Sequence, residues 1–243
     1  MGPLKFLFIA FFSTLFVTPL FSQAEIENDY GSWFVINGNN SIHEKWSIPT
    51  VGILRHHGML ADYEFGFFRT GINYQKSEKI QFGIGGAFLS SKFYLPEEHF
   101  ETGHQYWFYQ ESTLKSKLYR SSIAQRLRLE NRWIYRNNEV RFNMRVRYRL
   151  QFIQNLNEKT YLKVFDEFFV NLNDAFFNQN RLYIGIGHRV SKNINVDIGY
   201  LKNHFTSTQN DVIRMGINFK TNLLSGKASN AKIDNPSTIS TTD

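Results

Sequence analysis

The residues best suited to chemistry are arginines that recur at every second position in the middle of the 243-residue chain. They occupy two segments, RLRLENR at 126–132 and RFNMRVRYRL at 141–150. A guanidinium group is always charged, and its planar fork of N–H groups matches carboxylates and phosphates. Arginines gathered on one face therefore predict either a ladder of arginine–carboxylate pairs or a site for anions.

Extending the same alternation along the chain predicts one polar face with ten arginines but only three acids, Glu130, Glu167 and Asp197. Buried charges are tolerated only when they are paired, so the surplus needs loop carboxylates, backbone carbonyls, water or an anion. A salt-bridge ladder that stiffens the protein is one interpretation, and a narrow anion-favouring pore or anionic-ligand site is the other. The candidate residues are Arg126, Arg128, Glu130, Arg132, Arg141, Arg145, Arg147, Arg149, Glu167, Gln179, Arg181, Arg189, Asp197 and Arg214.

A second, weaker possibility is a hydrolase or lipid-modifying site in the loops, which would need a histidine beside a carboxylate and a nucleophile. The alternative is ordinary polar loops. The residues gathered at two expected loops are His56, His57 and Asp62 in one, and Glu97, Glu98, His99 and His104 in the other.

The absence of cysteine excludes disulfides, thiol catalysis and cysteine-bound metals, and we expect no cofactor or metal.

Side chains that alternate in this way require β-strands, and period-two alternation continues for about 10 to 15 residues in one segment after another. Polar residues typical of turns separate the segments. The expected strands are Trp46–His57, Tyr63–Tyr74, Ile80–Phe93, Gln105–Leu114, Leu118–Ile134, Glu139–Gln154, Thr160–Leu172, Phe177–Val190, Ile194–Phe205 and Gln209–Lys220, with a shorter piece at Tyr30–Asn37.

The apolar face of these strands decides between a soluble and a membrane barrel. A soluble sandwich or periplasmic barrel also alternates, with its charged face in water. However, the chain has 24 Phe, 12 Tyr and 4 Trp, and the strands have the roughly 9 to 11 residues that a membrane requires. Each arginine facing lipid costs about 2 to 4 kcal/mol, so four on one strand would cost on the order of ten. We therefore expect an all-β, single antiparallel transmembrane β-barrel whose arginines face the lumen.

The chain divides into three parts. Lys5 and the apolar run Phe6–Phe21, followed by Ser22-Gln23-Ala24, predict a cleaved signal peptide at residues 1–24. The barrel is expected at 25–220 and a flexible tail at 221–243, which lacks aromatic residues. The chain is expected to be exported, and its basic residues alternate strictly with apolar ones. The net charge of +7 therefore does not predict nucleic-acid binding. The expected partners are outer-membrane lipid and possibly small anions, in the outer membrane of a Gram-negative bacterium.

The number of strands follows from the connections. Links such as His57–Asp62 and Leu95–Gly103 are longer than those between them, and long loops are expected outside the cell. The link Arg136–Asn138 is an exception, because it is short where a long loop is expected. Because single-chain bacterial barrels have even strand counts, we expect about ten strands, or twelve if Tyr30–Asn37 is one of a further pair.

Four segments resemble the signature of exported bacterial proteins, typically from Bacteroidetes, catalogued as domain of unknown function 2490: RLRLENR at 126–132, RVRYRL at 145–150, DEFFVN at 166–171 and FNQNRLYIG at 177–185. The resemblance extends over about Trp33–Phe219 and implies an outer-membrane barrel without an established activity. One segment departs from the family pattern. The family usually has an acid and an arginine ahead of a glutamine, where this chain has HQYWFYQ at 104–110.

Overall fold

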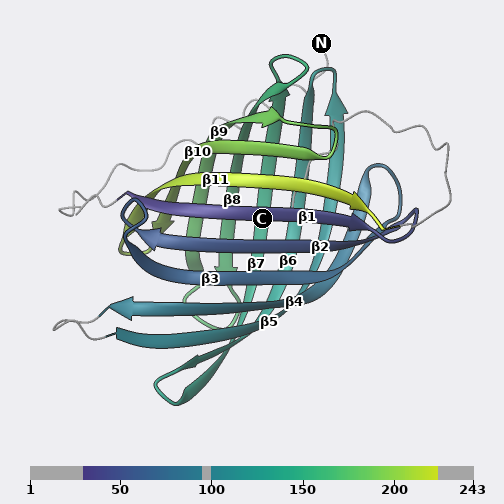
Figure 1. Ribbon diagram of the computed structural model, residues 1–243. Helices are drawn as coiled ribbons and strands as arrows, with labels where there is room; N and C mark the ends of the chain where they lie inside the picture. Colours follow the sequence, from purple (N-terminus) through teal and green to yellow (C-terminus); the bar gives the residue numbers. More distant parts are fainter. Residues whose placement is uncertain (1–29, 95–99, 224–243) are drawn as a thin grey trace, which may run out of the picture.

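The fold is a closed β-barrel of eleven strands, seen in a computed structural model that describes residues 30–94 and 100–223 (Figure 1). Within these residues no helix is long and apolar enough to cross a membrane. The expected all-β barrel is confirmed. The strands are β1 (Gly31–Ser41), β2 (Trp46–His57), β3 (Asp62–Gln75), β4 (Ile80–Tyr94), β5 (Phe100–Leu118), β6 (Ser121–Arg136), β7 (Glu139–Asn155), β8 (Thr160–Asn171), β9 (Phe177–Arg189), β10 (Ile194–Phe205) and β11 (Gln209–Asn222).

The expectations of ten and of twelve strands are both wrong, because β1 is a full strand that closes the barrel alone. It pairs antiparallel with β2 and parallel with β11, from Gly31 opposite Val212 to Ser41 opposite Asn222. Figure 1 shows β1 (purple) between β11 (yellow) and β2. Its last residues, GNNS at 38–41, have the composition of a turn, which is why the sequence predicted a shorter piece. Pairing on both sides holds them in the sheet instead.

The odd number of strands places the two ends of the barrel chain at opposite rims. We name the rim where β1 begins the N-terminal rim and the rim where β11 ends the C-terminal rim. The links at the two rims differ little in length, for example 172–176 at the first and 156–159 at the second. Loop length therefore does not distinguish the two ends as the sequence suggested. The expected signal peptide lies outside the described residues, as does the chain from 224 onward, and β11 extends to Asn222.

The short link between β6 and β7 is a two-residue turn. Asn137 and Asn138 have φ angles of 51° and 61°, and positive φ at both central residues is the geometry of the tight hairpin turn that fits strand twist. Asparagine tolerates this conformation better than most residues. The local chemistry of these two residues therefore explains why this link is short.

Large aromatic side chains inside the barrel pack over glycines of neighbouring strands. A Cβ atom on Gly187 would lie 2.0 Å from Cζ of Tyr161, and one on Gly85 would lie 2.7 Å from the Tyr109 hydroxyl. Tyr161 is 6% exposed and Tyr109 is fully buried. These glycines are required because a side chain would occupy the volume that the tyrosines fill.

Gly187→Val is therefore expected to destabilise the barrel by about 1 to 3 kcal/mol or to prevent its folding, because the new side chain overlaps Tyr161. Gly52→Val is the matched control, since a Cβ on Gly52 has nothing within 4 Å. The measurement is the midpoint of thermal unfolding of the purified barrel in detergent. Equal midpoints for the two variants would contradict this packing.

Candidate functional site in the barrel interior

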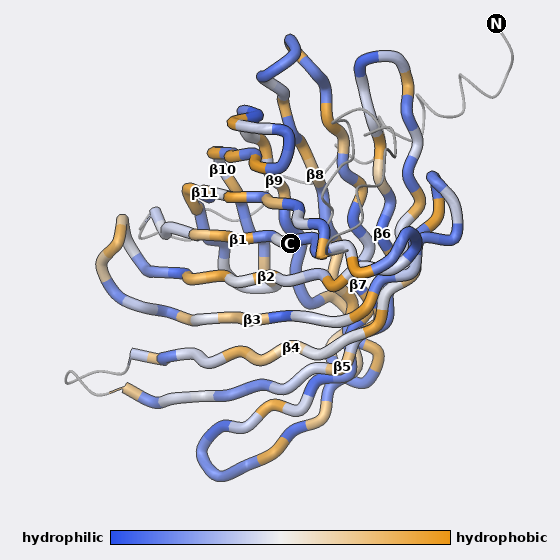
Figure 2. Tube along the Cα trace, turned by 45° about the vertical axis from the view of Figure 1, so that its right-hand side comes forward, coloured by the Kyte–Doolittle hydropathy of each residue, from blue (hydrophilic) through white to orange (hydrophobic). Residues whose placement is uncertain are grey.

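Along each strand, side chains point alternately to the interior and to the outside of the barrel. In β7, Arg145, Arg147 and Arg149 are 6%, 5% and 2% exposed, whereas Tyr148 between them is 38% exposed. The resulting alternation of hydrophilic and hydrophobic residues along the strands is visible in Figure 2. The charged face of the central strands is therefore the buried one, as the period-two spacing requires.

Glu167 of β8 is one centre of the buried ion pairs. Its Oε1 accepts hydrogen bonds from Arg126 Nη2 at 2.8 Å and from Arg147 Nη2 at 2.9 Å. Its Oε2 accepts one from Arg149 Nη2 at 2.8 Å and lies 3.7 Å from Arg181 Nη1. Because Glu167 is completely buried, these arginines supply the partners that its charge needs away from water.

Glu130 of β6 is the second centre. Its Oε2 accepts hydrogen bonds from Arg145 Nε at 2.8 Å and Nη2 at 2.7 Å, and its Oε1 accepts one from Arg147 Nη1 at 2.7 Å. Arg128 Nη1 lies 3.6 Å away. Arg147 thus joins Glu130 to Glu167, and the two carboxylates share one connected network.

Two further buried carboxylates hold ion pairs on other strands of the barrel, and Arg128 joins the first of them, Glu111, to Glu130. Glu111 of β5 accepts hydrogen bonds from Arg128 Nε at 2.8 Å and Nη2 at 2.6 Å, and it lies 3.5 Å from Arg69 Nη1. Asp197 of β10 bonds to Arg214 and accepts a hydrogen bond from the Tyr183 hydroxyl at 2.9 Å. The ion pairs therefore reach from β3 to β11.

Aromatic rings fill the space between the guanidinium groups. Arg149 lies 4.2 Å from the ring centre of Phe165, and Arg147 lies 4.5 Å from that of Phe169. Both rings are 1% exposed. A ring face attracts a cation, most strongly where water is excluded, so these aromatics stabilise arginines that outnumber the acids.

The candidate residues do not all lie in this network. Arg141 is apart from it, with a side chain 63% exposed and paired with Asp174, because it lies near the start of β7 at the N-terminal rim. Arg189 bonds to Asn155 and to the backbone oxygen of Glu158 near the C-terminal rim. The structure buries Arg126, Arg128, Glu130, Arg132, Arg145, Arg147, Arg149, Glu167, Gln179, Asp197 and Arg214, and leaves Arg181 half-buried.

Several interior charges were missed from the sequence, notably Arg55, Arg69, Glu111 and Lys163. Arg55 and Arg69 are 5% and 1% exposed, and Glu111 pairs with Arg69. Arg69 and Glu111 are each flanked by uncharged residues, FF and TG around Arg69 and YQ and ST around Glu111, so no run of charges marks them. The alternation of β3 and β5, extended residue by residue, was the signal that could have found Arg69 and Glu111.

The loop histidines do not assemble one site among residues 30–94 and 100–223. His57 lies 3.6 Å from Glu64, but that carboxylate lies closer, at 2.6 Å, to Arg55. His104 stacks on Phe88 with ring centres 5.9 Å apart. No group of three potential metal ligands occurs in the described chain, and the expected loop residues Glu97, Glu98 and His99 lie outside it.

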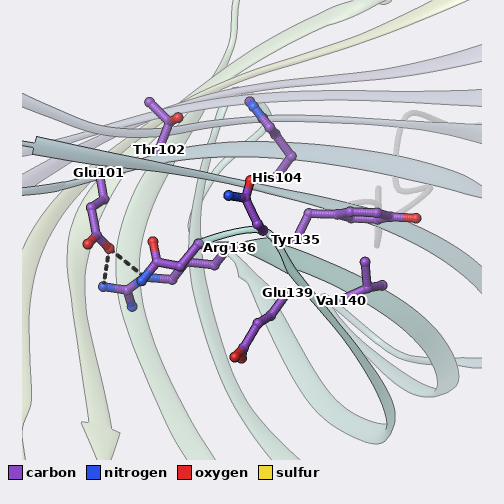
Figure 3. A pocket seen from close by; sticks show the side chains of 9 residues that line it. Glu101, Thr102, His104, Tyr135, Arg136, Glu139 and Val140 are labelled. Carbon is purple, nitrogen blue, oxygen red and sulfur yellow. Dashed lines mark hydrogen bonds and ion pairs between the residues drawn. The ribbon is translucent and has the colours of Figure 1, made fainter.

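A pocket of about 420 Å³ lies beside His104 at the N-terminal rim (Figure 3). Glu101 and Arg136, which line it, form an ion pair at 3.0 Å. Figure 3 shows that the Glu101 carboxylate points to this arginine rather than to His104. Among the described residues that line the pocket, His104 therefore has no carboxylate paired with it for acid–base chemistry.

Comparison with known proteins gives a family but no activity. The family model described as "Protein of unknown function (DUF2490)" matches residues 30–214. No curated protein matches the chain. The match includes β1 to β10 and the first part of β11, so it covers nearly all of the barrel.

Glu167→Gln is expected to lower the free energy of unfolding by about 3 to 5 kcal/mol, because it removes the negative charge that the buried arginines share. Glu101→Gln is the control: it breaks the pair with Arg136, whose side chain is 45% exposed, and should cost only about 0 to 1 kcal/mol. Urea unfolding of both variants in detergent measures the difference. Similar losses would show that the network contributes little.

Proposed function

The chain belongs to the DUF2490 family, whose function is unknown, and we propose that it is a closed β-barrel of the bacterial outer membrane with a structural or interaction role. The observation that carries the proposal is the combination of an apolar outer face with a charged, buried interior. The proposal includes export by a signal peptide at residues 1–24, as the sequence predicts.

The outer face exposes large apolar side chains on every strand of the barrel. Soluble proteins rarely expose one continuous apolar surface of this kind, which is typical of contact with lipid or a partner. One exposed residue from each strand illustrates it: Ile36, Leu54, Phe68, Ile84, Phe108, Leu127, Phe142, Phe168, Ile184, Ile198 and Ile217, which are 37% to 55% exposed.

The length and closure of the sheet support the same location. The strands have 11 to 19 residues, whereas about 9 to 11 are enough to cross a membrane. A closed barrel pairs every strand on both sides, and the bilayer requires this because it offers no water to unpaired backbone groups. In this proposal the signal peptide takes the chain across the inner membrane of a Gram-negative bacterium, and the apolar outer face then favours insertion into the outer membrane.

The filled interior supports a structural or interaction role over a pore. Arg126, Arg128, Glu130 and Glu167 in the middle of the barrel are at most 1% exposed, so water has almost no access to them. An open pore would leave such side chains hydrated. Their positive excess would favour anions if the barrel opened. An enzymatic loop site has less support, because Arg55 holds the carboxylate nearest to His57.

Ile184→Arg tests the membrane location. Ile184 is 50% exposed near the middle of β9, and an arginine there should cost about 2 to 4 kcal/mol in lipid but little in water. The control is Leu156→Arg, in the β7–β8 link, where the side chain is 52% exposed. The yield of folded protein in washed outer membranes should fall for Ile184→Arg alone. Equal yields would contradict a lipid-facing β9.

Planar-bilayer recording tests the closed interior. The wild-type barrel should insert without producing a steady current, because its central charges are paired and inaccessible to water. Insertion is checked independently by protease protection of the same protein in vesicles. A steady, anion-selective current from inserted wild-type protein would replace the structural role with the pore.

A further inference from the structure

Four interior side chains from four strands lie together toward the N-terminal rim, and we name them the Trp33 cluster: Trp33, Arg55, Arg181 and Asn203. Trp33 is near the start of β1, Arg55 near the end of β2, Arg181 in the first half of β9 and Asn203 near the end of β10. The strand directions bring all four positions toward the same rim.

Two guanidinium groups lie against the Trp33 ring. The Arg181 guanidinium carbon is 4.6 Å from the ring centre and that of Arg55 is 5.3 Å away. The indole is 3% exposed, and its Nε1 has no hydrogen-bond acceptor. A buried indole N–H normally has one, so the cluster presents a donor without an acceptor between two positive charges.

Asn203 adds a second donor of the same kind. Its Oδ1 accepts a hydrogen bond from Arg181 Nε at 2.9 Å, which fixes the orientation of the amide. Its Nδ2 has no acceptor, although the residue is completely buried. Reversing the amide would place its NH₂ group against the guanidinium. The Asn203 Nδ2 group is therefore a buried donor without a hydrogen-bond acceptor.

The neighbouring carboxylates leave the cluster with a surplus of donors. Glu64 lies 2.6 Å from Arg55 Nε, and the amide oxygen of Asn210 accepts a hydrogen bond from Arg55 Nη2 at 2.7 Å. Glu167 lies 3.7 Å from Arg181 and accepts shorter hydrogen bonds from Arg147 and two further arginines. Each guanidinium group has five N–H donors. The acceptors beside Arg55, Glu64 and Asn210, and those beside Arg181, Asn203 and Glu167, do not use them all.

We propose that the Trp33 cluster binds a small oxyanion, a phosphate or carboxylate group, through the Trp33 Nε1–H, the Asn203 amide and the guanidinium groups of Arg55 and Arg181. An oxyanion carries several acceptor atoms for these donors, and its negative charge balances the positive charge of the two arginines. A water molecule could accept the hydrogen bonds but would leave that charge unbalanced. Arg181 is the member of the cluster with the most exposed side chain, at 15%. This site is independent of the proposed membrane role.

The indole N–H resonances of the full-length protein in a neutral, phosphate-free detergent test the site directly. The chain has four tryptophans, and Trp33→Phe identifies the resonance of Trp33. Titration with phosphate or acetate at constant ionic strength should move this resonance downfield and reach saturation. Trp107 is the internal control, because its Nε1 already donates to Gln105 Oε1 at 2.9 Å, and its resonance should not move.

Asn203→Asp supplies the matched variant. The aspartate keeps an acceptor for Arg181 Nε and replaces the free donor by a negative oxygen, so phosphate affinity should fall at least about tenfold. Asn157→Asp makes the same change of charge in the exposed β7–β8 turn and should leave the affinity unchanged. If Asn203→Asp does not fold, Arg181→Lys tests the loss of the guanidinium fork and should also weaken binding.

Three results would overturn the proposal. The first is a Trp33 resonance that neither oxyanion moves. The second is an equal response to chloride, or an equal movement of the Trp107 resonance, since either would indicate a general salt effect. The third is an unchanged affinity in folded Asn203→Asp.

Discussion

The pairing of buried charge is the constraint on which the barrel depends. Glu130 and Glu167 are removed from water by the sheet around them, and Arg147 bonds to both. Because the charges come from strands between β3 and β11, a strand that moved out of register would leave several of them without partners. The ion pairs therefore hold neighbouring strands in one arrangement as well as neutralising each other.

Arginine has two properties that suit this interior and that a lysine ammonium group does not offer together. Its planar group donates to two carboxylates at once, as Arg147 does, and Arg147 also lies over the ring of Phe169. The rings exclude water and lower the cost of burying more cations than acids. The same surplus, toward the N-terminal rim, is associated with the unmatched donors of the Trp33 cluster.

Closure by eleven strands has a topological consequence for the whole chain. Since β1 and β11 run parallel, Gly31 and Asn222 lie at opposite rims. In the proposed outer-membrane location these two residues would face opposite sides of the membrane. Any partner that approaches one rim then meets only one end of the barrel chain, which gives an interaction role a defined direction.

Alternation is a local property, so the strands and their faces could be predicted from the residues alone: β2 and β10 have the predicted bounds, and Arg145, Arg147 and Arg149 are buried as a set. The strand count, the partners of each charge and the isolated charges Arg69 and Glu111 were decided by the tertiary structure. They depend on which strands become neighbours and in what register. The parallel contact of β1 with β11 joins residues about 180 positions apart, and no local pattern encodes such a pairing.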